Sequence, residues 1–241
     1  MPFINSKKCW SNMKKLPVTL SKTEFSHGLG FICFQHLLLP ILLGSLSVLF
    51  PTEAELNFAY FLINFIASLV LFRNFLWQEL EVAVERPKQI LTAIAIGYAL
   101  YYALSTVVGI FVDLIDPEFS NLNDAGITAM SKDHFALMTV GTVLFVPIAE
   151  ELLFRGVLFN RIYHEHPVVA CIVSVTLFSM VHLIGFIGTY SPLHFLLAFL
   201  QYLPAGITLC FAYVRSGTIF ASVLFHTLVN AIAMYYAFIV R

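Results

Sequence analysis

Seven long apolar stretches constrain this chain more than any other feature of its sequence. A helix needs about twenty apolar residues to cross the roughly 30 Å hydrocarbon layer of a bilayer. Stretches of sufficient length lie near residues 28–50, 56–77, 90–115, 135–162, 168–187, 193–214 and 218–240. The sequence shows no ladder of alternating ten-residue segments that would indicate a barrel, so helices must satisfy the backbone groups in lipid. The sequence therefore predicts an all-α, polytopic membrane bundle of about seven transmembrane helices.

The composition agrees with this class. Of the 241 residues, 59% are hydrophobic and only 11% are charged, whereas soluble domains carry about 25% charged residues. The formal net charge of −1 says little about soluble partners. We expect the lipid bilayer as a partner and no nucleic acid.

Basic residues are distributed unevenly between the loops. Five Lys residues precede the first stretch, and the loops on the same side of the membrane add Arg86, Lys88, Arg161 and Arg215. The loops on the other side hold only Lys132 and the terminal Arg241. Because cytoplasmic loops are enriched in Lys and Arg, the N-terminus is predicted to be cytoplasmic and the C-terminus external. The compact chain and short loops favour a bacterial cell membrane.

Two carboxylates and a guanidinium lie in the middle of the fourth stretch. A charge at the bilayer centre costs at least about 2.5 kcal/mol, so these groups need partners or a task. Glu151 and Arg155 are four residues apart and can pair on one helix face, while Glu150 points about 100° away. A nearby proline, Pro147, predicts a kink and a local cavity. One carboxylate is then structural, and the other is available for proton transfer.

The next two sets of polar residues follow on later helices. Phe178 and His182 are spaced i, i+4, which places the aromatic ring beneath the imidazole. His226 and Asn230 share a face of the last helix, and both can donate hydrogen bonds to a developing oxyanion. The alternatives are a packing histidine and an interhelical bridge. Asn64 in the second stretch is likewise expected to bridge helices or to snorkel.

These motifs resemble those of the CPBP family of intramembrane proteases, also called the Abi family, which includes the CAAX prenyl endopeptidases. The family pattern is EExxxR, then FxxxH, then HxxxN. It occurs here in order, as Glu150–Arg155, Phe178–His182 and His226–Asn230. The resemblance covers roughly residues 135–235. It implies an all-helical core around a conical cavity, and hydrolysis of a peptide bond in a membrane-associated substrate.

The resemblance also implies roles for the motif residues. Glu150 is expected to activate water, and His182 to orient that water or shuttle its proton. His226 and Asn230 are expected to stabilise the oxyanion, with Phe178 supporting His182. Glu151 with Arg155 would hold the helix, although Glu151 could share the catalytic role because paired carboxylates titrate together. Water is expected to attack the carbonyl directly and to reach the site from the cytoplasmic side.

The organisation of the chain follows from this assignment. We expect a cytoplasmic basic arm over residues 1–27, three transmembrane helices with an outer loop over 28–134, and the CPBP/Abi catalytic core over 135–241. All three parts belong to one bundle without separate globular domains.

Cofactor, substrate and activity leave alternatives open. No metal is expected to be obligatory, but Glu150, His182 and His226 could instead supply a zinc site with two histidines and one glutamate. CAAX-type proteins, pheromone precursors and bacteriocin leaders all suit such an endopeptidase. A non-catalytic scaffold that confers immunity or regulates a sensor is the alternative to a protease, followed by a proton-coupled transporter.

Overall fold

The computed structural model describes residues 15–239, and this part of the chain is helical and contains no strand. The first half contains α2 (Lys22–Cys33), η1 (Phe34–Leu38), α3 (Leu39–Ser45), η2 (Ser47–Leu49), α4 (Glu53–Leu71), α5 (Arg73–Glu85) and α6 (Pro87–Ile115). The second half contains α7 (Leu122–Asp133), α8 (Phe135–Thr139), η3 (Val140–Phe145), α9 (Val146–Glu151), η4 (Leu152–Phe159), α10 (Asn160–Tyr163), α11 (Pro167–Val181), η5 (Ile184–Phe186), α12 (Pro192–Ser216) and α13 (Ile219–Ile239). The predicted all-α polytopic bundle is confirmed.

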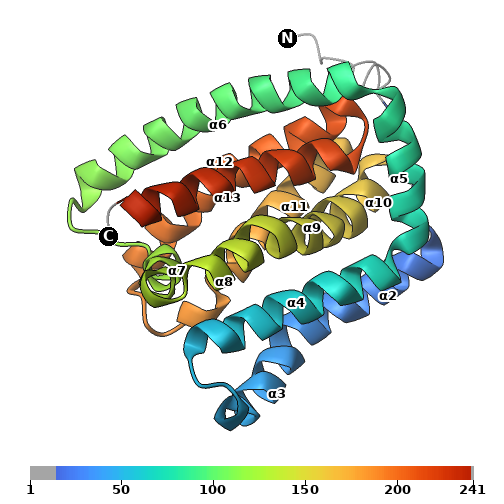
Figure 1. Ribbon diagram of the computed structural model, residues 1–241. Coiled ribbons are helices and arrows are strands. Elements are labelled where there is room, and N and C mark those ends of the chain that lie inside the picture. The colour runs from blue at the N-terminus through green and yellow to red at the C-terminus, as the bar shows by residue number, and fades with distance from the viewer. Residues whose placement is uncertain (1–14, 240–241) are drawn as a thin grey trace.

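Six helical rods among the described residues are long and apolar enough to cross a membrane. Two of these rods contain π-helical turns as well as α-helix. The turn η1 lies within residues 22–45, and the turn η3 lies within residues 135–163. α11 was expected as the fifth span but has only 15 residues. It ends at Val181, six residues before the end of the predicted stretch 168–187. Figure 1 shows the rods lying roughly along one direction, with α7 crossing them near one end.

Residues 16–27 of the expected basic arm pack against the bundle. Leu16, Val18 and Leu20 are buried in the core, alternating along an extended segment. Asn160 fixes this segment, because its side-chain amide accepts from the Leu20 N–H and donates to the Val18 carbonyl, each at 2.9 Å. The first helix starts at Lys22, where Ser21 and Glu24 form a capping box. Residues 1–14 of the expected arm lie outside the described residues.

The connecting helix α5 was not separated from the second span in the prediction. It carries Glu79, which is fully buried and binds the start of α13. The carboxylate accepts hydrogen bonds from the Ile219 N–H and the Tyr213 hydroxyl, each at 2.8 Å. Tyr213 in turn accepts from Asn160 at 2.7 Å. This chain of contacts joins α5, α10, α12 and α13 at one end of the bundle.

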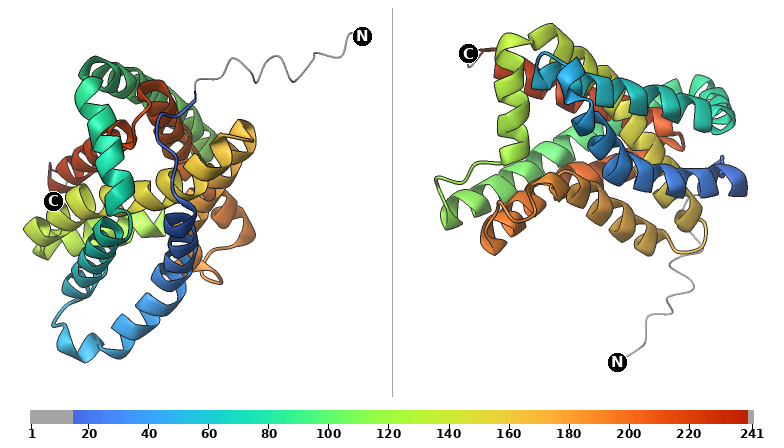
Figure 2. Two further views of the ribbon diagram at one scale, coloured as in Figure 1. Left: turned by 90° about the vertical axis from the view of Figure 1, so that its right-hand side faces the viewer. Right: turned by 90° about the horizontal axis from the view of Figure 1, so that it is seen from below.

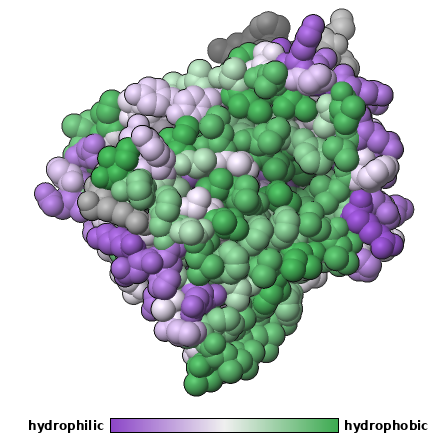
Figure 3. Space-filling model, in the orientation of Figure 1, coloured by the Kyte–Doolittle hydropathy of each residue, from purple (hydrophilic) through white to green (hydrophobic). Residues whose placement is uncertain are grey.

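Basic residues cluster at this α5 end of the bundle. Figure 2 shows that the starts of α2 and α6 and the turn between α12 and α13 lie close to α5 and α10. These positions carry Lys22, Arg86, Lys88, Arg161 and Arg215. In Figure 3 a broad apolar surface lies between polar regions at opposite sides of the molecule. This arrangement is that of an integral membrane protein. The predicted cytoplasmic side of the basic end stays a prediction.

Turns of π-helix flank the segment that bears the two glutamates. η3 precedes Pro147, and η4 follows Glu151 directly. Pro147 cannot donate a backbone hydrogen bond, so a wider turn before it replaces the regular ladder. The predicted irregularity at Pro147 is therefore present as a π turn.

Candidate active site

A cavity of about 1010 Å³ lies between α4, α6, α7, α9, α11, α12 and α13. Glu150, His182, His226 and Asn230 line its inner part. Residues 120–128 around the start of α7, and Ala237 on the last turns of α13, line the outer part. Among the described residues, none of the basic side chains at the α5 end lines it. The cavity therefore extends away from the basic end, whereas we had expected water to enter from that side.

Glu151 and Arg155 form the predicted i, i+4 ion pair behind the cavity. The Arg155 Nη1 donates to Glu151 Oε1 at 2.9 Å, and both side chains are fully buried. Arg155 Nη2 also donates to the Gly206 carbonyl at 3.2 Å, and its guanidinium lies 4.5 Å from the Phe178 ring centre. A Cβ on Gly206 would meet a Val175 methyl at 3.0 Å, so this glycine allows the close approach of α12 to α11. The buried positive charge of Arg155 is thus compensated by the Glu151 carboxylate, the Gly206 carbonyl and the Phe178 ring.

Glu150 points in a different direction, as the helix geometry predicts. Its side chain is 17% exposed and lines the cavity. Each oxygen faces a different imidazole: Oε1 lies 3.9 Å from His182 Nε2, and Oε2 lies 3.9 Å from His226 Nε2. Neither distance is a direct hydrogen bond. Oε2 has no hydrogen-bond partner at all. The structure therefore brings these three predicted site residues together, with Glu150 between the two histidines.

His182 is held by the end of its own helix. Because α11 stops at Val181, the Phe178 carbonyl has no continuing helical donor, and His182 Nδ1 lies 2.7 Å from it. A carbonyl oxygen only accepts, so Nδ1 carries the proton and donates. The ring stacks on Tyr202, at 4.4 Å between centres, and contacts the tilted ring of Phe178 at 4.7 Å. Nε2 is left facing Glu150.

His226 is held by the buried carboxylate. Its Nδ1 lies 3.0 Å from Glu151 Oε1, the same oxygen that binds Arg155. An ionised carboxylate only accepts, so Nδ1 again carries the proton. Nε2 of His226 then faces Glu150 as an acceptor unless the ring is protonated. Glu151 therefore contacts both Arg155 and His226, which local spacing alone did not predict for His226.

Asn230 lies one turn beyond His226 and also lines the cavity. Its Nδ2 donates one hydrogen bond to the Thr142 carbonyl at 2.8 Å. Thr142 belongs to η3, where the π turn interrupts the regular ladder. An amide nitrogen has two hydrogens, so one of them remains for a ligand. The contact fixes the orientation of the amide.

The alternative zinc site would require Glu150, His182 and His226 to bind one ion. The histidine Nε2 atoms approach two different oxygens of Glu150, each at 3.9 Å. No group of three or more His, Cys, Asp or Glu side chains in residues 15–239 is placed to hold a metal ion. The side chains as arranged do not fit a zinc site, so we derive no step through a metal.

Some residues that complete the site were not found by sequence reasoning. Tyr202 stacks on His182 and is tied to the start of α7, where its hydroxyl donates to Asp124 at 3.0 Å and accepts from Asn123 at 3.1 Å. Gln35, His36 and Asn64 line the cavity from the first half of the chain. Asn64 was expected to bridge helices or to snorkel, but its side chain is buried and interacts with Tyr60 of the same helix. No local motif distinguishes these residues, since their roles depend on which helices pack together.

Comparison with known proteins agrees with the motifs and with this geometry. Residues 132–232 match the family described as type II CAAX prenyl endopeptidase Rce1-like. The chain is also 28% identical over 205 residues to the UPF0177 protein YbdJ of Lactococcus lactis subsp. lactis (strain IL1403), which covers 79% of this chain and 81% of that protein. No solved structure matches the chain significantly. The resemblance predicted from the three motifs is confirmed over residues 132–232, which are similar to the Rce1-like CAAX endopeptidases.

Proposed function

We propose that the chain is an intramembrane endopeptidase that hydrolyses a peptide bond in a membrane-associated peptide or protein, using water activated by Glu150. The observation that carries the proposal is the convergence of Glu150, His182 and His226 on one point of the cavity. CAAX-type proteins, pheromone precursors and bacteriocin leaders are the proposed substrate classes. The family resemblance of residues 132–232 supports proteolysis.

The hydrogen-bond roles at this point favour a bound water. With its Nδ1 donating to the Phe178 carbonyl, His182 presents Nε2 as an acceptor, and the Glu150 carboxylate facing it is an acceptor too. Acceptors that face one another need hydrogens between them, and a water molecule supplies two. Such a water lies within reach of a base, which is the first requirement for general base catalysis.

The proposed reaction uses no acyl-enzyme and no metal. Water attacks the carbonyl carbon and forms a C–O bond while its proton passes to Glu150. The free N–H of Asn230 and the protonated Nε2 of His226 donate to the oxyanion. When the C–N bond breaks, the proton returns from Glu150 to the leaving amine, with His182 orienting the water and assisting the transfer.

Charge balance supports the protonated form of His226 in this step. Glu150 and Glu151 carry two negative charges, and Arg155 carries one positive charge. A proton on His226 makes the set neutral, and Glu151 lies 3.0 Å from the nitrogen that shares the added charge. A carboxylate behind an imidazole stabilises the imidazolium in the same way in serine protease triads.

The test is cleavage of a panel of membrane-tethered peptides by purified protein in detergent, with and without a chelator. Glu150→Gln keeps the shape of the side chain but cannot take a proton, so we expect kcat to fall by at least about 100-fold. Glu165→Gln changes an exposed loop glutamate and serves as the matched control. Cleavage is expected to survive chelation.

Two results would change the proposal. Loss of cleavage on chelation, restored by zinc, would make Glu150, His182 and His226 ligands. If the wild type cleaved nothing while Glu150→Gln still conferred a cellular phenotype, a scaffold would replace the protease.

A further inference from the structure

The first half of the chain supplies one wall of the cavity, although it lies outside the region that matches the family. Gln35 and His36 come from η1, and Asn64 comes from α4. His36 interacts electrostatically with His182, and the neighbouring Tyr60 with Glu150. The wall therefore stands close to the proposed catalytic residues.

Polar atoms of this wall are buried and have no partner. They are Gln35 Oε1, His36 Nε2, and both Nδ2 and Oδ1 of Asn64. Gln35 and Asn64 are each only 3% exposed. Buried polar groups in folded proteins are nearly always hydrogen-bonded, and an exception requires an explanation.

The rest of the bundle shows that this fold can satisfy buried amides where they are structural. Asn160 is fully buried and makes hydrogen bonds to Leu20, Val18 and Tyr213. Asn64 is nearly as buried, but apart from an interaction with Tyr60 its amide atoms have no hydrogen-bond partner among the described residues. The difference indicates that Asn64 and Gln35 are kept for a ligand rather than for packing.

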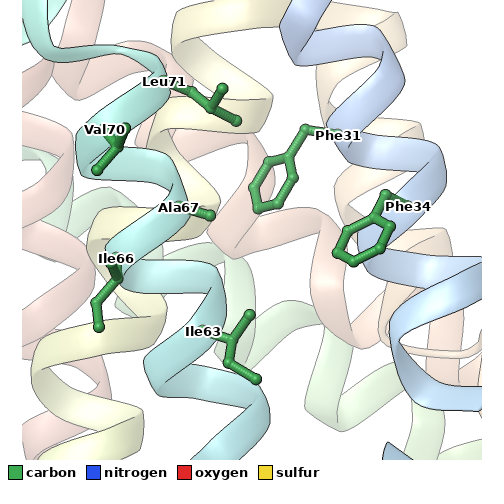
Figure 4. A pocket seen from close by; sticks show the side chains of 7 residues that line it. All are labelled: Phe31, Phe34, Ile63, Ile66, Ala67, Val70 and Leu71. Atoms are coloured by element: carbon green, nitrogen blue, oxygen red, sulfur yellow. The ribbon is translucent and has the colours of Figure 1, made fainter. Parts of the chain in front are cut away.

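The opposite side of the same two helices is apolar. Figure 4 shows a groove between them lined by Phe31, Phe34, Ile63, Ile66, Ala67, Val70 and Leu71. Two of the three polar wall residues lie next in sequence to a groove residue, since Gln35 follows Phe34 and Asn64 follows Ile63. The apolar groove faces outward, and the polar residues turn into the cavity.

The chemistry of the wall matches a peptide main chain. Side-chain amides contain both a donor and an acceptor, as a peptide unit does. A substrate segment must unwind to be cleaved, and inside a membrane its freed N–H and C=O groups need protein partners. We propose that Gln35, His36 and Asn64 bind the extended main chain of the substrate beside the scissile bond. This inference rests on the proposed endopeptidase function.

The test separates substrate binding from stability. Gln35→Met and Asn64→Leu replace unpaired amides with apolar side chains of similar size. Each is expected to raise KM for a tethered peptide of the panel about five- to tenfold, the effect of one lost hydrogen bond. Each should change Tm little, because the amide loses no hydrogen bond other than its interaction with Tyr60. Ser68→Ala is the matched control, since Ser68 is also buried and unpaired on α4 but does not line the cavity.

Tm measurements test the polar wall without any substrate, and a second variant serves as the reference for a structural amide. Asn160→Leu breaks native hydrogen bonds and should lower Tm by several degrees. If Asn64→Leu lowered Tm as much, the amide would be structural and the proposal would be wrong. If the wild type were active and both wall variants had unchanged KM and kcat, the proposed substrate-binding role would also be wrong. The proposed endopeptidase function would not be affected by that result. Binding of the same peptide to Glu150→Gln, weakened by Asn64→Leu, would support the wall even if no peptide were cleaved.

Discussion

At the scale of single residues, Glu151 connects the structural and the chemical parts of the site. One of its oxygens binds Arg155 at 2.9 Å and His226 at 3.0 Å. Removing one partner of a buried ion pair leaves an uncompensated charge and costs about 3–5 kcal/mol. Glu151 therefore stabilises the fold, and it also sets the tautomer of His226.

Glu151→Gln tests the second role. The amide keeps the size of the side chain but cannot balance a protonated His226, so we expect kcat to fall about 100-fold with KM little changed. Ser179→Ala is the control, because Ser179 is fully buried on α11 and unpaired. Steady-state kinetics on a cleaved peptide give both constants. A raised KM with unchanged kcat would contradict a positioning role.

At the scale of elements, α5 fixes the start of the helix that carries His226 and Asn230. Glu79 on α5 accepts the first N–H of α13, where a negative charge also interacts favourably with the helix dipole. The Thr218 hydroxyl donates back to the Glu79 carbonyl at 3.1 Å. Burial raises the pKa of the Glu79 carboxyl, and the hydrogen bonds from Ile219 and Tyr213 only partly offset this effect.

The raised pKa of Glu79 predicts the direction of a pH effect on stability. The folded state holds the proton to a higher pH than the unfolded state, whose glutamate pKa is about 4.3. Stability from this group is therefore greatest below about pH 4.3 and falls as pH rises towards the folded pKa. Glu79→Gln removes the titration. Thermal unfolding across pH should show this fall in the wild type relative to the variant, and parallel profiles would contradict it.

At the scale of the whole molecule, the cavity and the basic residues lie at opposite ends. Lys22, Arg86, Lys88, Arg161 and Arg215 mark one end, whereas the cavity reaches the start of α7 at the other. If the basic end is cytoplasmic, as the positive-inside rule indicates, the cavity opens to the outer side. Substrate would then be cleaved from the outer face.

Side-specific labelling tests this orientation. In a background with Cys9, Cys33, Cys171 and Cys210 changed to Ser, we expect Asp124→Cys to react with a membrane-impermeant maleimide in intact cells. Lys88→Cys should react only after permeabilisation. Both positions are exposed in the bundle. The reverse pattern would place the cavity opening in the cytoplasm.

The sequence by itself determined the features that depend on local spacing and hydrophobicity. The helical membrane class follows from apolar length, and the Glu151–Arg155 and Phe178–His182 contacts follow from the i, i+4 geometry of a helix. Three ordered motifs were sufficient to predict the resemblance to the family that residues 132–232 match. Each of these inferences needs only the periodicity of one segment.

The tertiary structure alone decided the contacts between distant segments. Glu151 binds His226 across 75 residues, and Asn230 binds Thr142 across 88. The polar wall at Gln35 and Asn64, and the end at which the cavity opens, likewise depend on which helix faces pack together. An apolar helix in lipid can rotate and pair in several ways, because hydrophobicity alone does not choose its neighbours. Packing in the folded bundle makes that choice.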